Sequence, residues 1–290
     1  MNYRHAFHAG NFADVLKHTV LLGLLDALKT KSTPFCYIDT HAGAGCYDLR
    51  DEEANKTGEH LAGVQRLLAV KNPPVLLQRY LDELRALNHE QVNHDEMQAS
   101  DAISIYPGSP LLASRCMRES DRAQLCELQT DEAHKLRQLM RNDLRIAVHQ
   151  RDGYEALKAF VPPKERRGLV LIDPPFEAQD DEFRIIESAL ANAHARWPTG
   201  TYAVWYPIKL RQQIMPFHRW FKTRGIRKVL VAELLLQPDT SPLRLNGCGM
   251  LLIHPPWQFD QQLEQLMPVL QRELTVAGGS SWSVEWLVGE

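Results

Sequence analysis

The sequence predicts an α/β fold built on a mostly parallel, doubly wound sheet. Short runs rich in β-branched and aromatic residues alternate with helical patterns along most of the chain, as expected for strands joined by crossover helices. The run Leu169–Ile172 is apolar at every position, which is typical of a central strand with helices on both faces. A ligand crevice is therefore expected beyond the carboxyl ends of the strands.

The expected strands follow one another through the chain, separated by helical segments. They cover Phe35–Thr40, Gln124–Leu128, Leu144–His149, Gly168–Asp173, Thr201–Tyr206, Val229–Leu236 and Gly249–His254.

One segment interrupts this alternation between the first and second expected strands. It is charged and carries leucines at helical spacing, with Asn72-Pro73-Pro74 between two helices. We interpret residues 47–104 as a small inserted helical subdomain, and residues 1–46 and 105–290 as the main α/β domain. The leucine stripes indicate packing, and the alternative is a helix face that binds a partner.

Composition indicates a globular protein without a membrane segment. The 290 residues are 44% hydrophobic, which suffices for one large domain with a substantial core. The apolar run Val20–Leu28 is far shorter than the roughly 20 residues of a membrane span. The first residues are polar and aromatic where a signal peptide would be apolar, so we expect a cytoplasmic protein. Five scattered cysteines without paired spacing are expected to stay reduced.

Positive charge is concentrated in one stretch although the net charge is −3. Lys209–Lys228 contains seven Lys or Arg residues and no Asp or Glu. Two interpretations remain open, a surface that follows a nucleic-acid backbone and an ordinary solvated helix face.

The strongest chemical signal is an apolar strand that ends in Asp173-Pro174-Pro175-Phe176. Two prolines stop the strand and fix the backbone, so that the Asp173 carboxylate and the Pro174 carbonyl can face the crevice as hydrogen-bond acceptors. Phe176 offers a face on which an extruded base can stack. The alternative is a plain Pro-Pro loop after a core strand.

Two acceptors beside an aromatic ring suit methylation of an adenine amine. The lone pair of that amine is delocalised into the ring, and hydrogen bonds from both N–H groups draw the nitrogen toward a nucleophilic geometry. The methylated amine becomes acidic as it forms, so Asp173 or water can accept its proton afterwards. The expected electrophile is the sulfonium methyl group of S-adenosylmethionine.

Three other strand ends carry candidate cofactor contacts. Asp39–Gly45 is a small-residue turn that lets backbone amides approach a ligand. It lacks a full G-x-G-x-x-G, which favours S-adenosylmethionine over a dinucleotide. Glu127 stands where a ribose-binding acid is expected, or is a surface acid. Asp152-Gly153 could meet the cofactor's adenine, or form a simple turn.

The N-terminal segment is unusually rich in histidine and acid. His5, His8, Asp14 and His18 are candidate metal ligands, but their spacing does not match a known zinc pattern and no cysteine joins them. A lid or substrate clamp fits better, and we predict no metal site.

Several motifs in one order resemble the bacterial RlmJ family, which methylates N6 of one adenosine in 23S ribosomal RNA. They are Y-R-H-x-F-H-A-G-N-x-A-D-V-L-K-H at Tyr3–His18, D-T-H-A-G-A-G at Asp39–Gly45, Y-P-G-S-P at Tyr106–Pro110, L-I-D-P-P-F at Leu171–Phe176, Y-A-V-W-Y-P at Tyr202–Pro207, L-R-Q-Q-I at Leu210–Ile214 and G-I-R-K at Gly225–Lys228.

This resemblance implies a Rossmann-like S-adenosylmethionine-dependent methyltransferase fold. It also implies a monomer that acts on 23S ribosomal RNA before ribosome assembly is complete. Asp173 would be the catalytic acceptor, alongside the Pro174 carbonyl and the stacking ring of Phe176 inferred above, while Tyr3 and Lys17 would belong to the N-terminal motif that meets substrate. Phe176 stands where relatives often have Tyr, so the hydroxyl is lost. Cofactor contacts would fall on His18, His41, Ser109, Glu127, Asp152, Gly153 and Asp173.

Two other functions remain to be weighed. Adenine in DNA is an alternative substrate, because D-P-P-aromatic motifs also serve DNA methyltransferases. A catalytically silent RNA-binding module that uses Lys209–Lys228 is the other, and a lack of cofactor binding would favour it.

Overall fold

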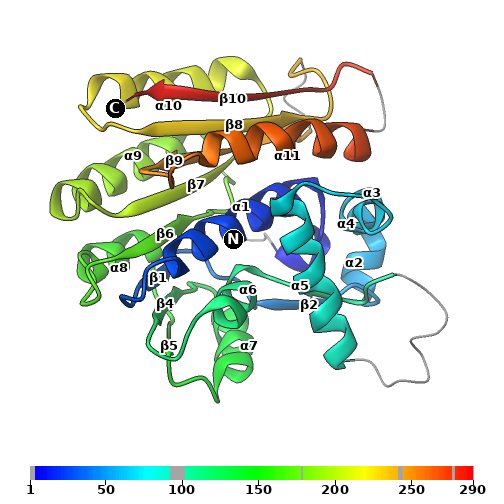
Figure 1. Ribbon diagram of the computed structural model, residues 1–290, viewed down its shortest axis with the longest axis horizontal. Coiled ribbons are helices and arrows are strands. Elements are labelled where there is room, and N and C mark those ends of the chain that lie inside the picture. The colour runs from blue at the N-terminus through cyan, green and yellow to red at the C-terminus, as the bar shows by residue number, and fades with distance from the viewer. Residues whose placement is uncertain (1–3, 92–101, 178, 241–243, 276–277, 290) are drawn as a thin grey trace.

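The computed structural model describes residues 4–91, 102–177, 179–240, 244–275 and 278–289 (Figure 1). Within them, an eight-stranded sheet has the order β10-β8-β9-β7-β6-β1-β4-β5. Its strands are β1 (Cys36–Asp39), β4 (Arg122–Cys126), β5 (Ile146–His149), β6 (Gly168–Ile172), β7 (Thr201–Ile208), β8 (Val229–Leu235), β9 (Gly247–Ile253) and β10 (Ser281–Val288).

The pairing confirms a mostly parallel sheet. β1 lies between β4 and β6 in parallel register, and β5 and β7 extend this parallel part on either side. β9 inserts antiparallel between β7 and β8, and β10 pairs antiparallel with β8 at the edge. The edge strand β10 was not predicted, although Trp282, Val284 and Trp286 alternate with the polar residues Ser281, Ser283 and Glu285 before Leu287 breaks the pattern.

Helices cover both faces of the sheet, as Figure 1 shows. Alternate residues of β6 enter two separate cores: Leu169 and Leu171 pack on one face, and Val170 and Ile172 pack on the other. This explains why the strand is apolar at every position. One layer contains α1 (Phe12–Lys29), α5 (Val75–Gln91), α6 (Ser109–Cys116) and α11 (Phe259–Leu274). The other layer contains α8 (Gly153–Phe160), α9 (Gln179–Arg196) and α10 (Arg211–Thr223). The helix α7 (Thr130–Met140) connects β4 to β5.

The segment predicted as an insertion is helical. Its helices are α2 (Glu52–Thr57), α3 (Glu59–Ala62), α4 (Val64–Leu67) and α5, and the short strands β2 (Cys46–Asp48) and β3 (Ile105–Pro107) pair at its base. Leu77, Tyr80, Leu81 and Leu84 of α5 are buried in the core that also contains α1, which confirms packing for this stripe. Leu61 is an exception at 61% exposed. The division into domains at residues 47 and 104 stays a prediction.

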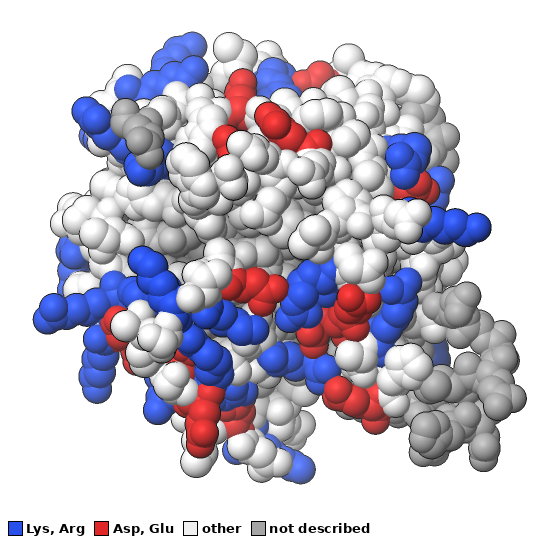
Figure 2. Space-filling view, in the orientation of Figure 1, with Lys and Arg blue, Asp and Glu red and all other residues white. Residues whose placement is uncertain are grey.

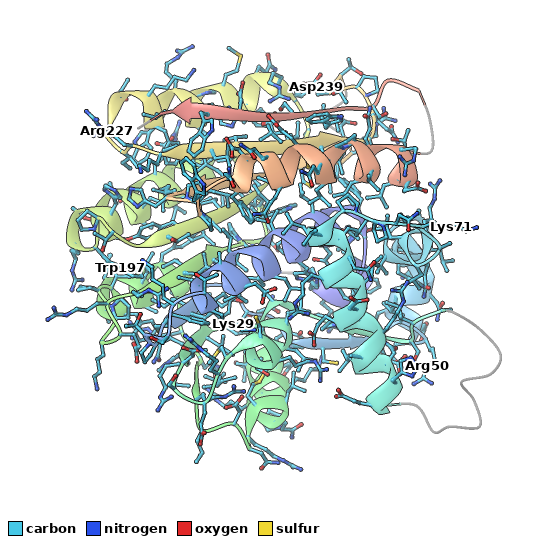
Figure 3. The ribbon with its side chains drawn as sticks, viewed as in Figure 1. Lys29, Arg50, Lys71, Trp197, Arg227 and Asp239 are labelled. Atoms are coloured by element: carbon cyan, nitrogen blue, oxygen red, sulfur yellow. The ribbon has the colours of Figure 1, made fainter. Side chains whose placement is uncertain are left out.

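The basic stretch Lys209–Lys228 runs from the end of β7 through α10 to the start of β8, and both interpretations of it stay open. α10 has 13 residues and therefore separates its ends by about 20 Å. At one end Arg211 is ion-paired with Glu233 and Asp239. Figure 3 shows Asp239 near the top of the view and Arg227 at the upper left. Acidic and basic side chains also intermix over the described part of the face in Figure 2.

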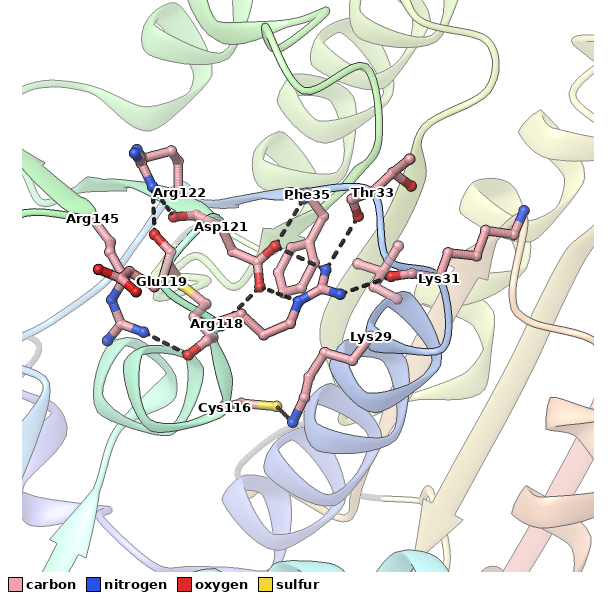
Figure 4. Close-up of polar contacts among 12 residues, drawn as sticks. Lys29, Lys31, Thr33, Phe35, Cys116, Arg118, Glu119, Asp121, Arg122 and Arg145 are labelled. Carbon is pink, nitrogen blue, oxygen red and sulfur yellow. Dashed lines mark hydrogen bonds and ion pairs between the residues drawn. The ribbon is translucent and has the colours of Figure 1, made fainter.

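A buried carboxylate fixes the entry into β1 (Figure 4). Asp121, fully buried just before β4, accepts hydrogen bonds from the Phe35 amide at 3.1 Å and from Arg118 Nε at 3.0 Å. Arg118 also donates to the carbonyls of Lys31 and Thr33. The loop between α1 and β1 is thereby tied to the start of β4, next to which β1 lies in the sheet.

We expect Asp121→Ala to lower the free energy of unfolding by about 1–3 kcal/mol, because it leaves the Phe35 amide and Arg118 without their acceptor. Burial opposes ionisation, but the Arg118 hydrogen bonds hold the pKa of Asp121 below its usual value. Its contribution is therefore present above the unfolded carboxyl pKa of about 4 and is lost as pH falls through the lower folded pKa. Urea unfolding at pH 7 and at acid pH measures both effects.

Asp181→Ala is the control for this measurement. Asp181 forms an exposed ion pair with Arg184, and such pairs contribute about 0–1 kcal/mol. Equal effects of the two substitutions would contradict the assigned role of Asp121.

Candidate active site

A cavity of about 990 Å³ opens beyond the carboxyl ends of the parallel strands. Parallel strands all end at one edge of their sheet, so residues that follow different strands converge there. The predicted site residues in the described part of the chain all line it: Lys17, His18, His41, Ser109, Glu127, Asp152, Gly153, Asp173, Pro174 and Phe176. Tyr3 lies outside the described residues.

A buried lysine links the N-terminal helix to the Asp-Pro-Pro segment. Lys17 Nζ donates to Asp173 Oδ2 at 2.6 Å and to Asp14 Oδ1 at 2.8 Å, with the lysine side chain 6% exposed. Burial disfavours the ammonium, but the two carboxylates hold the pKa of Lys17 well above its usual value. The ion pair fixes the orientation of the Asp173 carboxylate, whose side chain still reaches the cavity.

Asp14 also anchors the segment that precedes α1. His5 Nε2 and the Gly10 amide each lie 3.0 Å from Asp14 Oδ2. Although burial opposes ionisation, the charges of His5 and Lys17 hold the pKa of Asp14 well below its usual range. The first described residues of the chain are thus held beside the cavity by the carboxylate that holds Lys17.

The inserted segment supplies a second anchor. Glu59 of α3 accepts from Asn11 Nδ2 at 2.9 Å and lies 3.0 Å from His8 Nδ1. The hydrogen bond with Glu59 raises the pKa of His8. Asn11 also caps α1, because its side-chain oxygen accepts from the Ala13 and Asp14 amides. Glu59 was not among the predicted site residues, and no local pattern distinguishes it from its acidic neighbours.

Phe176 is more enclosed than a free stacking surface would be. Its side chain is 5% exposed and contacts Phe183 and Trp205 edge-on, with ring centroids 5.3 and 5.7 Å away. Its φ of 49° lies in the left-handed region, which is unusual for a bulky residue. The turn after Pro175 therefore directs the ring into an aromatic cluster at the cavity wall.

His18 and His41 are neutral imidazoles in the cavity wall. Burial lowers the pKa of His18 to about 3 and that of His41 to about 4. His18 Nδ1 lies 2.8 Å from the Tyr106 hydroxyl, whereas the buried His18 Nε2 has no hydrogen-bond partner among the described residues. Buried polar atoms are nearly always paired, so this atom is a candidate ligand contact.

Ser109 reaches the site through a buried acid. Its hydroxyl donates to Asp39 Oδ2 at 2.7 Å, and the Tyr37 hydroxyl donates to the same oxygen. Burial raises the pKa of Asp39 to about 6, against the opposing effect of these hydrogen bonds. Asp39 was not predicted as a site residue. It supports the turn after β1 from below, because the His41 amide also donates to it.

Two further acids follow β4 and β5. Glu127 accepts from the Gly43 amide at 2.9 Å and from the Gln129 amide at 2.7 Å, while Asp152 caps α8. A side chain on Gly153 would approach the Thr40 carbonyl to 2.0 Å, so only glycine fits there. The glycine brings the start of α8 against the turn after β1.

These groups fit S-adenosylmethionine. Carboxylates at the ends of neighbouring strands can accept from ribose hydroxyls and from an adenine amine, and the small-residue turn gives close backbone approach. Acidic groups around the cavity also favour a cationic sulfonium. The unpaired His18 Nε2 offers one more polar contact. No group of three or more potential metal ligands occurs among the described residues.

Other cavity residues carried no sequence signal of their own. The Tyr154 hydroxyl donates a hydrogen bond to Glu182. Trp205 in β7 and Lys209 just after it line the same cavity. These residue types are common on helices and strands, so only the fold identifies them. None of the helices in the described part of the chain is long and apolar enough to cross a membrane.

Comparisons with known proteins identify the family of this chain. A family model described as "Ribosomal RNA large subunit methyltransferase D, RlmJ" matches residues 32–288. The chain is 42% identical to ribosomal RNA large subunit methyltransferase J of Escherichia coli and 41% identical to that of Haemophilus influenzae, over the full length of each protein.

A solved structure from Legionella pneumophila is similar throughout, with a TM-score of 0.85 and 34% identity over 96% of this chain and 98% of that chain. The family match and the full-length relatives together show that the chain belongs to the RlmJ family of large-subunit ribosomal RNA methyltransferases.

Proposed function

We propose that this protein transfers the methyl group of S-adenosylmethionine to N6 of a specific adenosine in 23S ribosomal RNA. The observation that carries the proposal is that Asp173 and Pro174, the two proposed acceptors, line the same cavity as Glu127, the acid proposed to bind the cofactor's ribose. Membership of the RlmJ family supports RNA as the substrate class. We further propose that the enzyme acts as a cytoplasmic monomer on RNA that is not yet fully assembled into a ribosome.

The cofactor supplies an electrophilic methyl group on a positively charged sulfur. Asp173 and the Pro174 carbonyl accept the two amine hydrogens of the adenine, which draws the nitrogen lone pair out of the ring plane. Lys17 holds Asp173 in the required orientation. The proton of the methylated amine leaves to Asp173 or to water after transfer.

Residues at three strand ends would hold the cofactor. Glu127 would accept from the ribose hydroxyls and Asp152 from the cofactor's adenine amine, while Gly153 permits close approach. The neutral His18 and His41 would complete the wall, and Ser109 would act through Asp39, to which it donates. Tyr3 is proposed to meet the substrate together with Lys17, on the family resemblance alone.

Mapping of methylated adenines tests the substrate. Ribosomal RNA from cells that lack the gene should lose one N6-methyladenine in 23S RNA, and complementation with the wild-type gene should restore it. Loss of N6-methyladenine from DNA instead would support the DNA alternative. Absence of S-adenosylmethionine binding by the purified protein would support the silent RNA-binding module.

We expect Asp173→Ala to reduce the methyl transfer rate at least 10²–10³-fold, because a preorganised acceptor at the reacting nitrogen is lost. Single-turnover kinetics on an RNA fragment that contains the target measures this rate. Cofactor affinity must be measured in parallel, because Asp173 is also a proposed cofactor contact. Near-normal turnover by a folded Asp173→Ala protein would contradict the catalytic role, and the exposed Asp181→Ala provides the control.

Phe176→Tyr should retain transfer, whereas Phe176→Ala should lose about 5- to 150-fold, because stacking of a base on an aromatic ring contributes about 1–3 kcal/mol. The ring also packs on Phe183 and Trp205, so rates are compared per folded molecule after denaturant titration. If the Ala and Tyr proteins turn over alike on that basis, the ring serves only packing.

A further inference from the structure

The charge of the cavity raises a question about where the RNA backbone can lie. Carboxylates far outnumber lysines along its wall, and the ammonium of Lys17 is held between Asp14 and Asp173. A phosphate brought into such surroundings would meet uncompensated negative charge. The carboxylate-bearing lining residues are Asp14, Glu59, Glu127, Glu132, Asp152, Glu155, Asp173 and Glu182.

Lys209 is the exception on this wall. It lines the same cavity, and within the described part of the chain it forms no ion pair or hydrogen bond through its ammonium. Arg211, only two residues further on, is instead neutralised by Glu233 and Asp239. Of the basic stretch, Lys209 is thus the residue that brings an uncompensated positive charge to the cavity.

The strand geometry places Lys209 at a definite distance from the reacting centre. β7 pairs with the end of β6 at Val204, opposite Ile172, and then runs on beyond β6, paired with β9 as far as Ile208. Trp205, Pro207 and Lys209 all line the cavity, as expected for alternate residues of one strand. At about 3.3 Å per residue, the Lys209 backbone lies roughly 16 Å beyond Val204. Lys209 therefore stands away from Asp173, on the far side of Trp205.

The backbone at Lys209 is held by a buried side chain. Asn246, which is fully buried before β9, donates through Nδ2 to the Lys209 carbonyl at 2.6 Å, and its own amide donates to the Ile208 carbonyl at 3.0 Å. The position from which the lysine side chain extends is thus fixed, although its ammonium is free to meet a ligand.

We propose that Lys209 binds a phosphate of the RNA backbone adjoining the target adenosine, while the extruded base enters the acidic part of the cavity. This inference rests on the proposed function. The adenine carries no charge and can pass the carboxylates, whereas its backbone stays where the unpaired cation lies. Lys209 is therefore a substrate-binding residue that orients the nucleotide and makes no contact with the reacting nitrogen.

Steady-state kinetics with an RNA fragment that contains the target tests this role. Lys209→Ala should raise the KM for RNA about tenfold, the scale of one hydrogen bond to a charged group, with little change in the affinity for S-adenosylmethionine. Lys209→Arg should recover most of the loss, because guanidinium also binds phosphate. The slope of log affinity against log salt should fall by about 0.7, as for one phosphate on single-stranded RNA.

Lys71→Ala is the matched control. Lys71 is exposed on the loop between α4 and α5 and lies outside the cavity lining (Figure 3). Its loss should leave the KM for RNA, the salt slope and cofactor binding unchanged. If Lys209→Ala behaves like Lys71→Ala, the proposal is wrong. It is equally wrong if Lys209→Ala weakens S-adenosylmethionine binding about as much as RNA binding, because the lysine would then serve the cofactor.

Neutral methylphosphonate linkages, placed one at a time around the target, identify the contact directly. The wild-type enzyme should lose affinity at the linkage that Lys209 meets, and Lys209→Ala should lose no more at that linkage. If Lys209→Ala lowers RNA affinity by the same factor whichever linkage is neutralised, the proposal is overturned. Failure of the wild-type enzyme to methylate any 23S fragment would instead contradict the proposed function, so the two failures are distinct.

Discussion

The ion pairs of Lys17 are the constraint on which the rest of the site depends. A buried ammonium is stable only with charged partners, and here the partners come from the first turns of α1 and from the end of β6. This requirement joins residues 156 positions apart and determines how the N-terminal helix lies against the Asp-Pro-Pro segment. The same ion pair also positions the segment before α1, because His5 and the Gly10 amide both bind Asp14.

A second consequence concerns how charge is divided between cofactor, base and backbone. The acids around the cavity suit a cationic sulfonium and two N–H donors of an adenine, and they oppose phosphate. Neutral His18 and His41 add polar contacts without positive charge, since burial lowers the pKa of both. An enzyme with net charge −3 can therefore act on RNA if contact with the backbone is confined to positions such as Lys209.

Much of the fold and of the candidate site was predictable because both depend on local patterns. The expected strands appear within a few residues of their predicted ends, and His41, Glu127, Asp152 and Asp173 converge because each follows a parallel strand. Lys17 and His18 reach the same cavity from α1. β10 was missed because an edge strand leaves only weak alternation. Glu59 and Lys209 were missed as site residues because an isolated acid on a helix or a lysine after a strand is ordinary in sequence.

The sequence by itself determined the α/β class, the strand ends that carry chemistry and, through its motifs, the family. These are properties of short segments, because the spacing of apolar residues, the turn residues and the prolines each determine the conformation of their own segment. Only the tertiary structure decided the partners of charged groups: that Lys17 meets Asp173, that the insertion anchors His8 and Asn11 through Glu59, and that, among the described residues, Arg211 is paired with Glu233 and Asp239 whereas Lys209 is not. Ionic partners are chosen by packing between distant segments, so a linear pattern of charges does not reveal which charge remains uncompensated.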